Sequence, residues 1–136
     1  MRYVLDTNIV SALMRQEPAP GRRLLSVAPA DVLVPQPVVA EVRYGLARLP
    51  RSHRRAALEH DARELLTAVA RAPWTDDVSL HFGALKVELE RRGERLDDFD
   101  VAIAAHALAH QAVLATRNVR HLGRIRHLLV EDWTRA

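Results

Sequence analysis

The sequence predicts an α/β fold of three layers, in which a central, mostly parallel sheet of four or five strands is flanked by helices. Short apolar segments alternate with longer segments whose apolar residues recur every three or four positions, a pattern typical of parallel sheets. The seven prolines punctuate the chain at the ends of these segments. A chain of 136 residues suits one core, so we expect a single domain over residues 1–136.

The expected strands are short apolar runs. They cover residues 2–6, 31–35, 112–115 and 128–130, with residues 73–75 as a shorter candidate. The first run ends at Asp6, which places a carboxylate at the carboxyl end of a buried strand. In open parallel sheets ligands bind at that edge.

Six helices are expected between the strands. They cover residues 7–15, 21–27, 38–49, 53–69, 77–92 and 98–111. We expect Thr7 or Asn8 to cap the first helix and Ser52 to cap the fourth, because short polar side chains accept hydrogen bonds from free amides. Gly93 is expected to end the fifth helix.

Composition excludes several classes of protein. The chain has no cysteine, which rules out disulfide scaffolds, thiolate zinc sites and cysteine nucleophiles. No apolar run approaches the ~20 residues of a membrane span. The first residues are a strand that meets Asp6 at once, unlike a signal peptide. We therefore expect a cytoplasmic protein.

The charge of the chain is weakly basic, with a formal value of +3 and a pI near 10.1. Lys86 is the only lysine among the 20 basic residues. Arginine binds phosphate through two parallel hydrogen bonds and stacks on bases, so a nucleic-acid partner fits this composition. A genomic preference for arginine codons explains it equally well.

Three acids are candidate metal ligands: Asp6, Glu41 and Asp100. Each has a simpler explanation alone, as a helix cap or as a solvated acid in a first helical turn. All three are expected at helix starts on the same side of the sheet, where they would raise one another's pKa unless a cation intervened. Ligands that offer only oxygen favour Mg²⁺ or Mn²⁺ over zinc.

A fourth polar segment, Ala115-Thr116-Arg117-Asn118, follows the strand over residues 112–115. Thr116 and Asn118 offer neutral oxygens that could orient a carboxylate or a metal-bound water. Both residue types are also common in turns and caps.

Taken in order, these motifs resemble those of PIN-domain ribonucleases, and most closely the VapC toxins of bacterial toxin–antitoxin pairs. The resemblance rests on five segments: Leu5-Asp6-Thr7-Asn8, Val39-Ala40-Glu41-Val42-Arg43-Tyr44-Gly45, the run from Phe99-Asp100 to Ala107, Ala115-Thr116-Arg117-Asn118 and Glu131-Asp132-Trp133. Each motif is weak alone, but together they cover nearly the whole chain in the right order.

The resemblance implies roles for particular residues. It implies that Asp6, Glu41 and Asp100 are the catalytic, metal-binding acids, supported by hydrogen bonds from Thr7 and Thr116. Asn8 and Asn118 are expected to support them as well. Many relatives have a fourth acid where this chain has Asn118, which removes one negative charge.

The resemblance also implies a cofactor and partners. Mg²⁺ is the expected ion, with Mn²⁺ as an alternative, and one or two ions could bind. The expected substrate is RNA, often a structured RNA such as tRNA. A cognate VapB-type antitoxin and a homodimer are expected partners. From their places near Glu41 and Asn118, Arg43, Arg117 and Arg120 are candidates to hold RNA phosphates.

Other functions fit less well. A phosphatase with an Asp-x-Asp-x-Thr motif would need an acid at Asn8 and a threonine at Val10. A phospho-acceptor domain would need a lysine after a late strand, whereas Lys86 falls in a predicted helix. The remaining alternative is a noncatalytic RNA- or partner-binding domain of the same fold.

Overall fold

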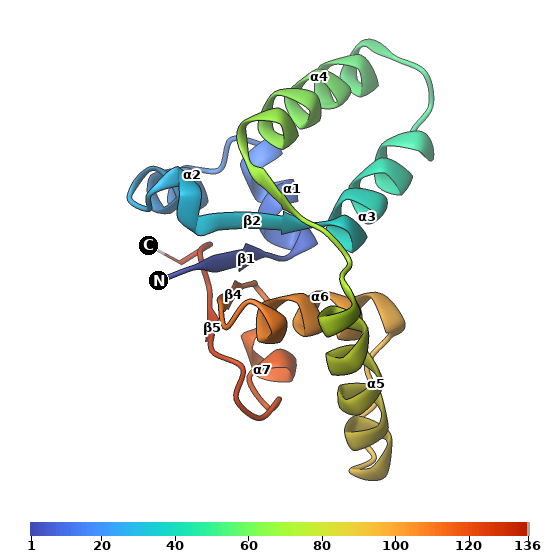
Figure 1. The fold of residues 1–136 in the computed structure, drawn as a ribbon. Coiled ribbons are helices and arrows are strands. Elements are labelled where there is room, and N and C mark those ends of the chain that lie inside the picture. Colours follow the sequence, from blue (N-terminus) through green and yellow to red (C-terminus); the bar gives the residue numbers. More distant parts are fainter. Residues whose placement is uncertain (136) are drawn as a thin grey trace.

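The computed structural model describes residues 1–135 and contains one five-stranded sheet (Figure 1). Its strands lie in the order β3-β2-β1-β4-β5, and every neighbouring pair is parallel. The strands are β1 (Tyr3–Leu5), β2 (Val32–Pro35), β3 (Ala70–Ala72), β4 (Val113–Ala115) and β5 (Val130–Glu131). The predicted mostly parallel α/β sheet is therefore confirmed.

Seven helices connect and cover the strands. They are α1 (Thr7–Met14), α2 (Pro18–Leu25), α3 (Gln36–Ala47), α4 (His53–Ala68), α5 (Asp76–Arg91), α6 (Asp98–Ala109) and α7 (Val119–Leu122). Helices α1 to α4 pack on one another, and α5 packs along α6. Parallel strands are joined by right-handed crossovers, so the reversal of direction after β3 places these two groups on opposite faces of the sheet.

The register of the sheet aligns the carboxyl ends of the central strands. Leu5 of β1 pairs with Ala115 of β4, which pairs in turn with Glu131 of β5. The residues that follow β1 and β4, Asp6 and Thr116, therefore emerge side by side. The amide of Asp6 extends the pairing by donating to the carbonyl of Ala115 at 2.9 Å.

The core is completed by a residue from the end of the chain. The side chain of Trp133 is 1% exposed and lies against Tyr3, with 5.4 Å between ring centroids. The guanidinium of Arg23 in α2 lies over both rings and forms an ion pair of 2.7 Å with Glu131. The C-terminal segment thus joins α2 to the first strand.

Several expected boundaries were wrong. The strand expected at residues 73–75 is β3, at Ala70–Ala72, because α4 ends before Val69 and releases the chain early. Helix α2 begins three residues before the expected start, since Pro18 occupies the first turn, where no amide hydrogen is needed. The short helix α7 was not predicted from its four residues.

Two helix starts differ in ways that affect the candidate acids. Asp6 caps α1 itself, so Thr7 and Asn8 are the first helical residues rather than caps. Helix α3 begins at Gln36, with Pro37 in its first turn, which places Glu41 in the second turn rather than the first. Within residues 1–135, no helix is both long enough and apolar enough to span a membrane.

Candidate active site

Asp6 lies at the junction of β1 and α1 and is 5% exposed. One carboxylate oxygen accepts a hydrogen bond from the amide of Thr7 at 2.7 Å, and the other accepts one from the hydroxyl of Thr116 at 2.7 Å. These bonds, one from the start of α1 and one from the end of β4, fix the orientation of the carboxylate. The oxygen bound by Thr7 keeps a free lone pair for a further partner.

The polar side chains around Asp6 form a connected network. Asn8 directs its amide nitrogen toward Asp6 and Thr116, at 3.5 Å from each. The amide oxygen of Asn8 accepts from the backbone of Arg117 at 3.0 Å, and the Thr116 hydroxyl accepts from the backbone of Asn118 at 3.0 Å. The loop after β4 is therefore held against the start of α1.

Glu41 reaches the same edge of the sheet from α3. Its carboxylate accepts a hydrogen bond from the hydroxyl of Thr7 at 2.5 Å. Thr7 therefore contacts two of the candidate acids, since its backbone binds Asp6 and its side chain binds Glu41. A threonine directly after Asp6 can therefore orient both carboxylates at once.

Asp100 lies at the start of α6, one turn after Asp97. Asp97 caps the helix by accepting from the amide of Asp100 at 2.9 Å. Sequence reasoning assigned Asp97 only to capping. Its spacing of three residues from Asp100 was the signal that could have added it to the acidic group, because such residues share one face of a helix.

Four acids from three different elements interact electrostatically: Asp6, Glu41, Asp97 and Asp100. Burial raises the pKa of Asp100 to about 6, and the charges of Asp97, Asp6 and Glu41 raise it as well. Burial likewise raises the pKa of Glu41, against the hydrogen bond from Thr7. The pKa of Asp6 is raised by burial, while its bonds from Thr116 and Thr7 oppose the shift and Asp97 adds to it.

A divalent cation fits this chemistry. All the donors are oxygens, and their repulsion falls when a cation binds between them. Among residues 1–135, no three acidic or histidine side chains converge closely enough to enclose an ion by themselves. Mg²⁺ keeps several water ligands and binds few carboxylates directly, so acids that act partly through water suit it.

The remaining predicted site residues differ in their surroundings. Asn118 is half-buried, with its amide oxygen 2.8 Å from a ring nitrogen of His121. Arg43, Arg117 and Arg120 are exposed, and Arg117 forms an ion pair of 3.3 Å with Glu17. The structure thus places the three arginines at the surface, where their guanidinium groups remain accessible.

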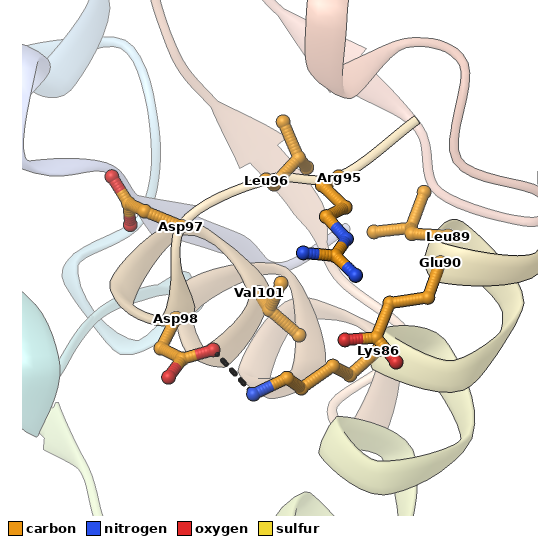
Figure 2. Close-up of a pocket in the computed structure, with 8 residues that line it drawn as sticks. All are labelled: Lys86, Leu89, Glu90, Arg95, Leu96, Asp97, Asp98 and Val101. Carbon is orange, nitrogen blue, oxygen red and sulfur yellow. Dashed lines mark ion pairs between the residues drawn. The ribbon is translucent and has the colours of Figure 1, made fainter. Parts of the chain in front are cut away.

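A small cavity of about 260 Å³ lies on the other side of the loop before α6 (Figure 2). Lys86 spans its mouth and pairs with Asp98 at 2.9 Å, while Arg95 points into it. Figure 2 shows the carboxylate of Asp97 directed away from these residues. The carboxylates of Asp97 and Asp98, which are neighbours in the chain, therefore face different surroundings.

Comparison with known proteins agrees with the fold. Residues 3–128 match the PIN domain. The chain belongs to the PIN-domain family. Within that family it is 34% identical to ribonuclease VapC1 of Haemophilus influenzae strain R2866, over 99% of this chain and 100% of the relative. It is 30% identical to ribonuclease VapC2 of H. influenzae strain KW20, over 98% of each chain.

Solved structures of PIN-domain toxins superpose well on this chain. The structure of VapBC-1 from nontypeable H. influenzae matches with a TM-score of 0.85 at 29% identity, covering 99% of this chain and 100% of that one. VapBC2 from Rickettsia felis, bound to a DNA fragment of its promoter, matches with a TM-score of 0.86 at 26% identity, over 96% and 98%. The resemblance to VapC ribonuclease toxins is therefore confirmed.

Proposed function

We propose that this protein is a Mg²⁺-dependent endoribonuclease, the toxin of a toxin–antitoxin pair, which hydrolyses phosphodiester bonds in RNA. The observation that carries the proposal is the electrostatic coupling of Asp6, Glu41 and Asp100. The charge of Asp6 raises the pKa of Glu41, and the charges of Asp6 and Glu41 both raise the pKa of Asp100. A noncatalytic binder of anionic RNA would gain nothing from such a negative site.

In this mechanism, Asp6, Asp100 and Glu41 hold the ion, directly or through water. An ion held there would supply a lowered pKa for a bound water molecule and a positive charge to offset that of the scissile phosphate. Thr116 and Thr7 keep the carboxylates of Asp6 and Glu41 in fixed orientations through the hydrogen bonds described above. Attack by water would leave a 3′-hydroxyl and a 5′-phosphate.

The proposed substrate is tRNA or another structured RNA. One relative, 25% identical over 98% of this chain and 99% of its own, is the tRNA(fMet)-specific endonuclease VapC of Shigella flexneri. Arg43, Arg117 and Arg120 are exposed, and we propose that they hold phosphates that flank the cleaved bond. Mn²⁺ is proposed to replace Mg²⁺, because both prefer oxygen ligands.

The proposed inhibitor is a cognate antitoxin, in keeping with the VapBC complexes that superpose on this chain. A groove beside the acids is lined by Thr7 and Glu41, by apolar residues of α1, α3 and α4, including Met14, Leu46 and Leu58, and by the basic residues Arg15 and Arg54. An antitoxin segment with an apolar face and an arginine would fit it, since the arginine would neutralise the acids. A homodimer is also part of the proposal.

The first prediction tests catalysis. We expect cleavage of a tRNA mixture by the wild-type protein to require Mg²⁺, and Asp6→Asn or Asp100→Asn to reduce the rate by about 100-fold or more. Asparagine keeps the size of the side chain while removing the charge. Glu64→Gln, an exposed change on α4, is the matched control and should cleave normally.

Equal cleavage by the wild type and both site variants, or cleavage that persists in EDTA, would contradict the proposal. Calorimetric titration with Mg²⁺ and Mn²⁺ separates the noncatalytic alternative. If neither ion binds the wild type, the noncatalytic domain is the better description.

A further inference from the structure

The segment that connects β4 to β5 is strongly basic. Residues 117–129 contain four arginines and two histidines but no acid, so this segment has a formal charge of +4, against +3 for the whole chain. All four arginines are exposed: Arg117, Arg120, Arg124 and Arg126. We call these four residues the crossover arginines. Such a local excess of positive charge indicates an anionic partner.

This segment leads away from the candidate active site. It begins directly after β4, where the backbone of Arg117 donates to Asn8 in the network around the acids. Because β5 is parallel to β4, with Val130 beside Leu114, the chain returns to the opposite edge of the sheet before β5 begins. Figure 1 shows this return, from α7 through a loop to β5. The last two crossover arginines lie on that loop, so the basic residues continue beyond the edge that holds the acids.

The loop meets the end of α5, which is also basic. The guanidinium of Arg92 donates to the carbonyl of Arg124 at 3.2 Å. Arg91, the last residue of α5, is exposed and forms no ion pair within residues 1–135. A groove of about 630 Å³ lies here, lined by Arg91, Arg92 and Arg126, by one acid, Glu88, and by small or apolar residues of α5.

The acids at this place do not balance the arginines. Glu88 lies 3.6 Å from Arg126 and 3.9 Å from Arg92. Glu94 lies 3.8 Å from Arg124 and 3.1 Å from Arg92. With the unpaired arginine at the end of α5, four arginines share two acids, which leaves a formal excess of +2. Exposed ion pairs are weak, so these arginines can readily exchange a carboxylate for a phosphate.

We propose that the crossover arginines and Arg91 form a second RNA-binding surface, which holds backbone phosphates of the substrate away from the cleaved bond. The inference rests on the proposed function, because it assigns this surface to the same RNA. Its new part is the extension from Arg117 and Arg120 to Arg124, Arg126 and Arg91.

The physical effect of such a surface is on affinity and orientation. Each phosphate that an arginine neutralises releases counterions, which favours binding and makes it depend on salt. Contacts to phosphates position a nucleic acid without reading its sequence. The surface would therefore favour a large, structured RNA over a short one, and it would leave the choice of the cleaved bond to residues near the acids.

The simpler explanation is structural, with the ion pairs of Arg124 and Arg126 fastening the loop to α5. That explanation does not use Arg91 or the excess of positive charge. It also makes a different prediction for the loss of Glu88. If Arg126 binds phosphate, Glu88 competes with the RNA and its removal tightens binding, whereas a purely structural ion pair predicts no gain in RNA affinity.

The first test is the Kd of the full-length chain for tRNA, measured by filter binding in EDTA. We expect a double variant with Arg124→Gln and Arg126→Gln to raise Kd by about tenfold at about 0.15 M salt. The slope of log affinity against log salt should become less steep by about 1.4–1.8, for two lost phosphate contacts. A double variant with Arg22→Gln and Arg63→Gln is the control, since it removes the same charge from exposed positions on α2 and α4.

The second test separates binding from a structural role. We expect Glu88→Gln to lower the Kd for tRNA by about threefold or more, because it removes a competing carboxylate. Glu64→Gln, an exposed change on α4 that alters the net charge equally, is the control and should leave Kd near the wild-type value. Circular dichroism confirms that each variant is folded.

Three results would overturn the inference. The first is an unchanged Kd and salt slope in the variant that lacks Arg124 and Arg126, which would favour an acidic protein segment as the occupant of this surface. The second is a control double variant that binds tRNA as weakly as that variant. The third is Glu88→Gln that binds tRNA no more tightly than Glu64→Gln.

The outcome is separable from the test of the proposed function. Asp6→Asn should bind tRNA in EDTA at least as tightly as the wild type, while failing to cleave it with Mg²⁺. The measurement in EDTA involves neither metal nor cleavage, so loss of catalysis and loss of this surface would be seen independently.

Discussion

At the scale of single residues, Asp97 is the clearest addition to the site. It caps α6, and its charge also raises the pKa of Asp100. We expect Asp97→Asn to keep the helix, because asparagine caps equally well, and to lower the pKa of Asp100 from about 6. Carboxyl ¹³C NMR titration without metal measures this value. Asp98→Asn is the control for a nearby acid that faces the Lys86 cavity.

An unchanged pKa at Asp100 in Asp97→Asn would mean that the charge of Asp97 does not contribute to the raised value. The raised pKa of Asp100 also determines how this residue changes the stability of the protein with pH. A raised carboxyl pKa means that the folded state binds the proton more tightly, so this contribution to stability is present at low pH. It is lost as the pH rises through about 6.

At the scale of an element, α6 contains a histidine on its buried face. His106 is fully buried, and its Nδ1 donates to the carbonyl of Ala102 at 2.7 Å. Its Nε2 has no hydrogen-bond partner among residues 1–135. Burial lowers the pKa of His106, against the bond to Ala102, and His110 lowers it further. The residue is therefore held neutral in the core.

A lowered histidine pKa means that the unfolded chain binds the proton more readily, so stability falls as the pH drops below about 6.5. We expect His106→Gln to unfold more easily at pH 7.5, by about 1 kcal/mol, and to lose less stability between pH 7.5 and 5.5 than the wild type. Urea denaturation at both pH values measures this. His53→Gln, an exposed change, should retain the wild-type dependence, and equal slopes for all three proteins would contradict the assignment.

At the scale of the whole molecule, Trp133 ties the end of the chain to its beginning. It packs on Tyr3 beneath Arg23, and its indole nitrogen donates to Glu131 at 3.0 Å. We expect Trp133→Ala to lower the free energy of unfolding by about 3–5 kcal/mol, measured in urea. Trp74→Ala is the control, because Trp74 is 46% exposed and should cost much less. Similar losses for both variants would contradict this role.

The local features of this protein follow from its sequence. An apolar run before Asp6 and another before Thr116 predict two buried strands, and parallel pairing brings their ends to one edge, as the register of Leu5 with Ala115 shows. The same logic predicted that Asp6, Glu41 and Asp100 would share an electrostatic environment. These predictions succeed because burial and strand direction are encoded by residues close together in the chain.

Only the tertiary structure decided the contacts between distant segments. Thr7 binds Glu41 and Thr116 binds Asp6 across 34 and 110 positions, and no local pattern specifies such partners. The place of β3 also depended on tertiary packing, since Ala70–Ala72 carries little strand propensity and pairs because β2 offers it an edge. The sequence by itself determined that Asp6 and Thr116 follow buried strands, and the packing of distant segments determined how these side chains are oriented and which face of α5 remains exposed.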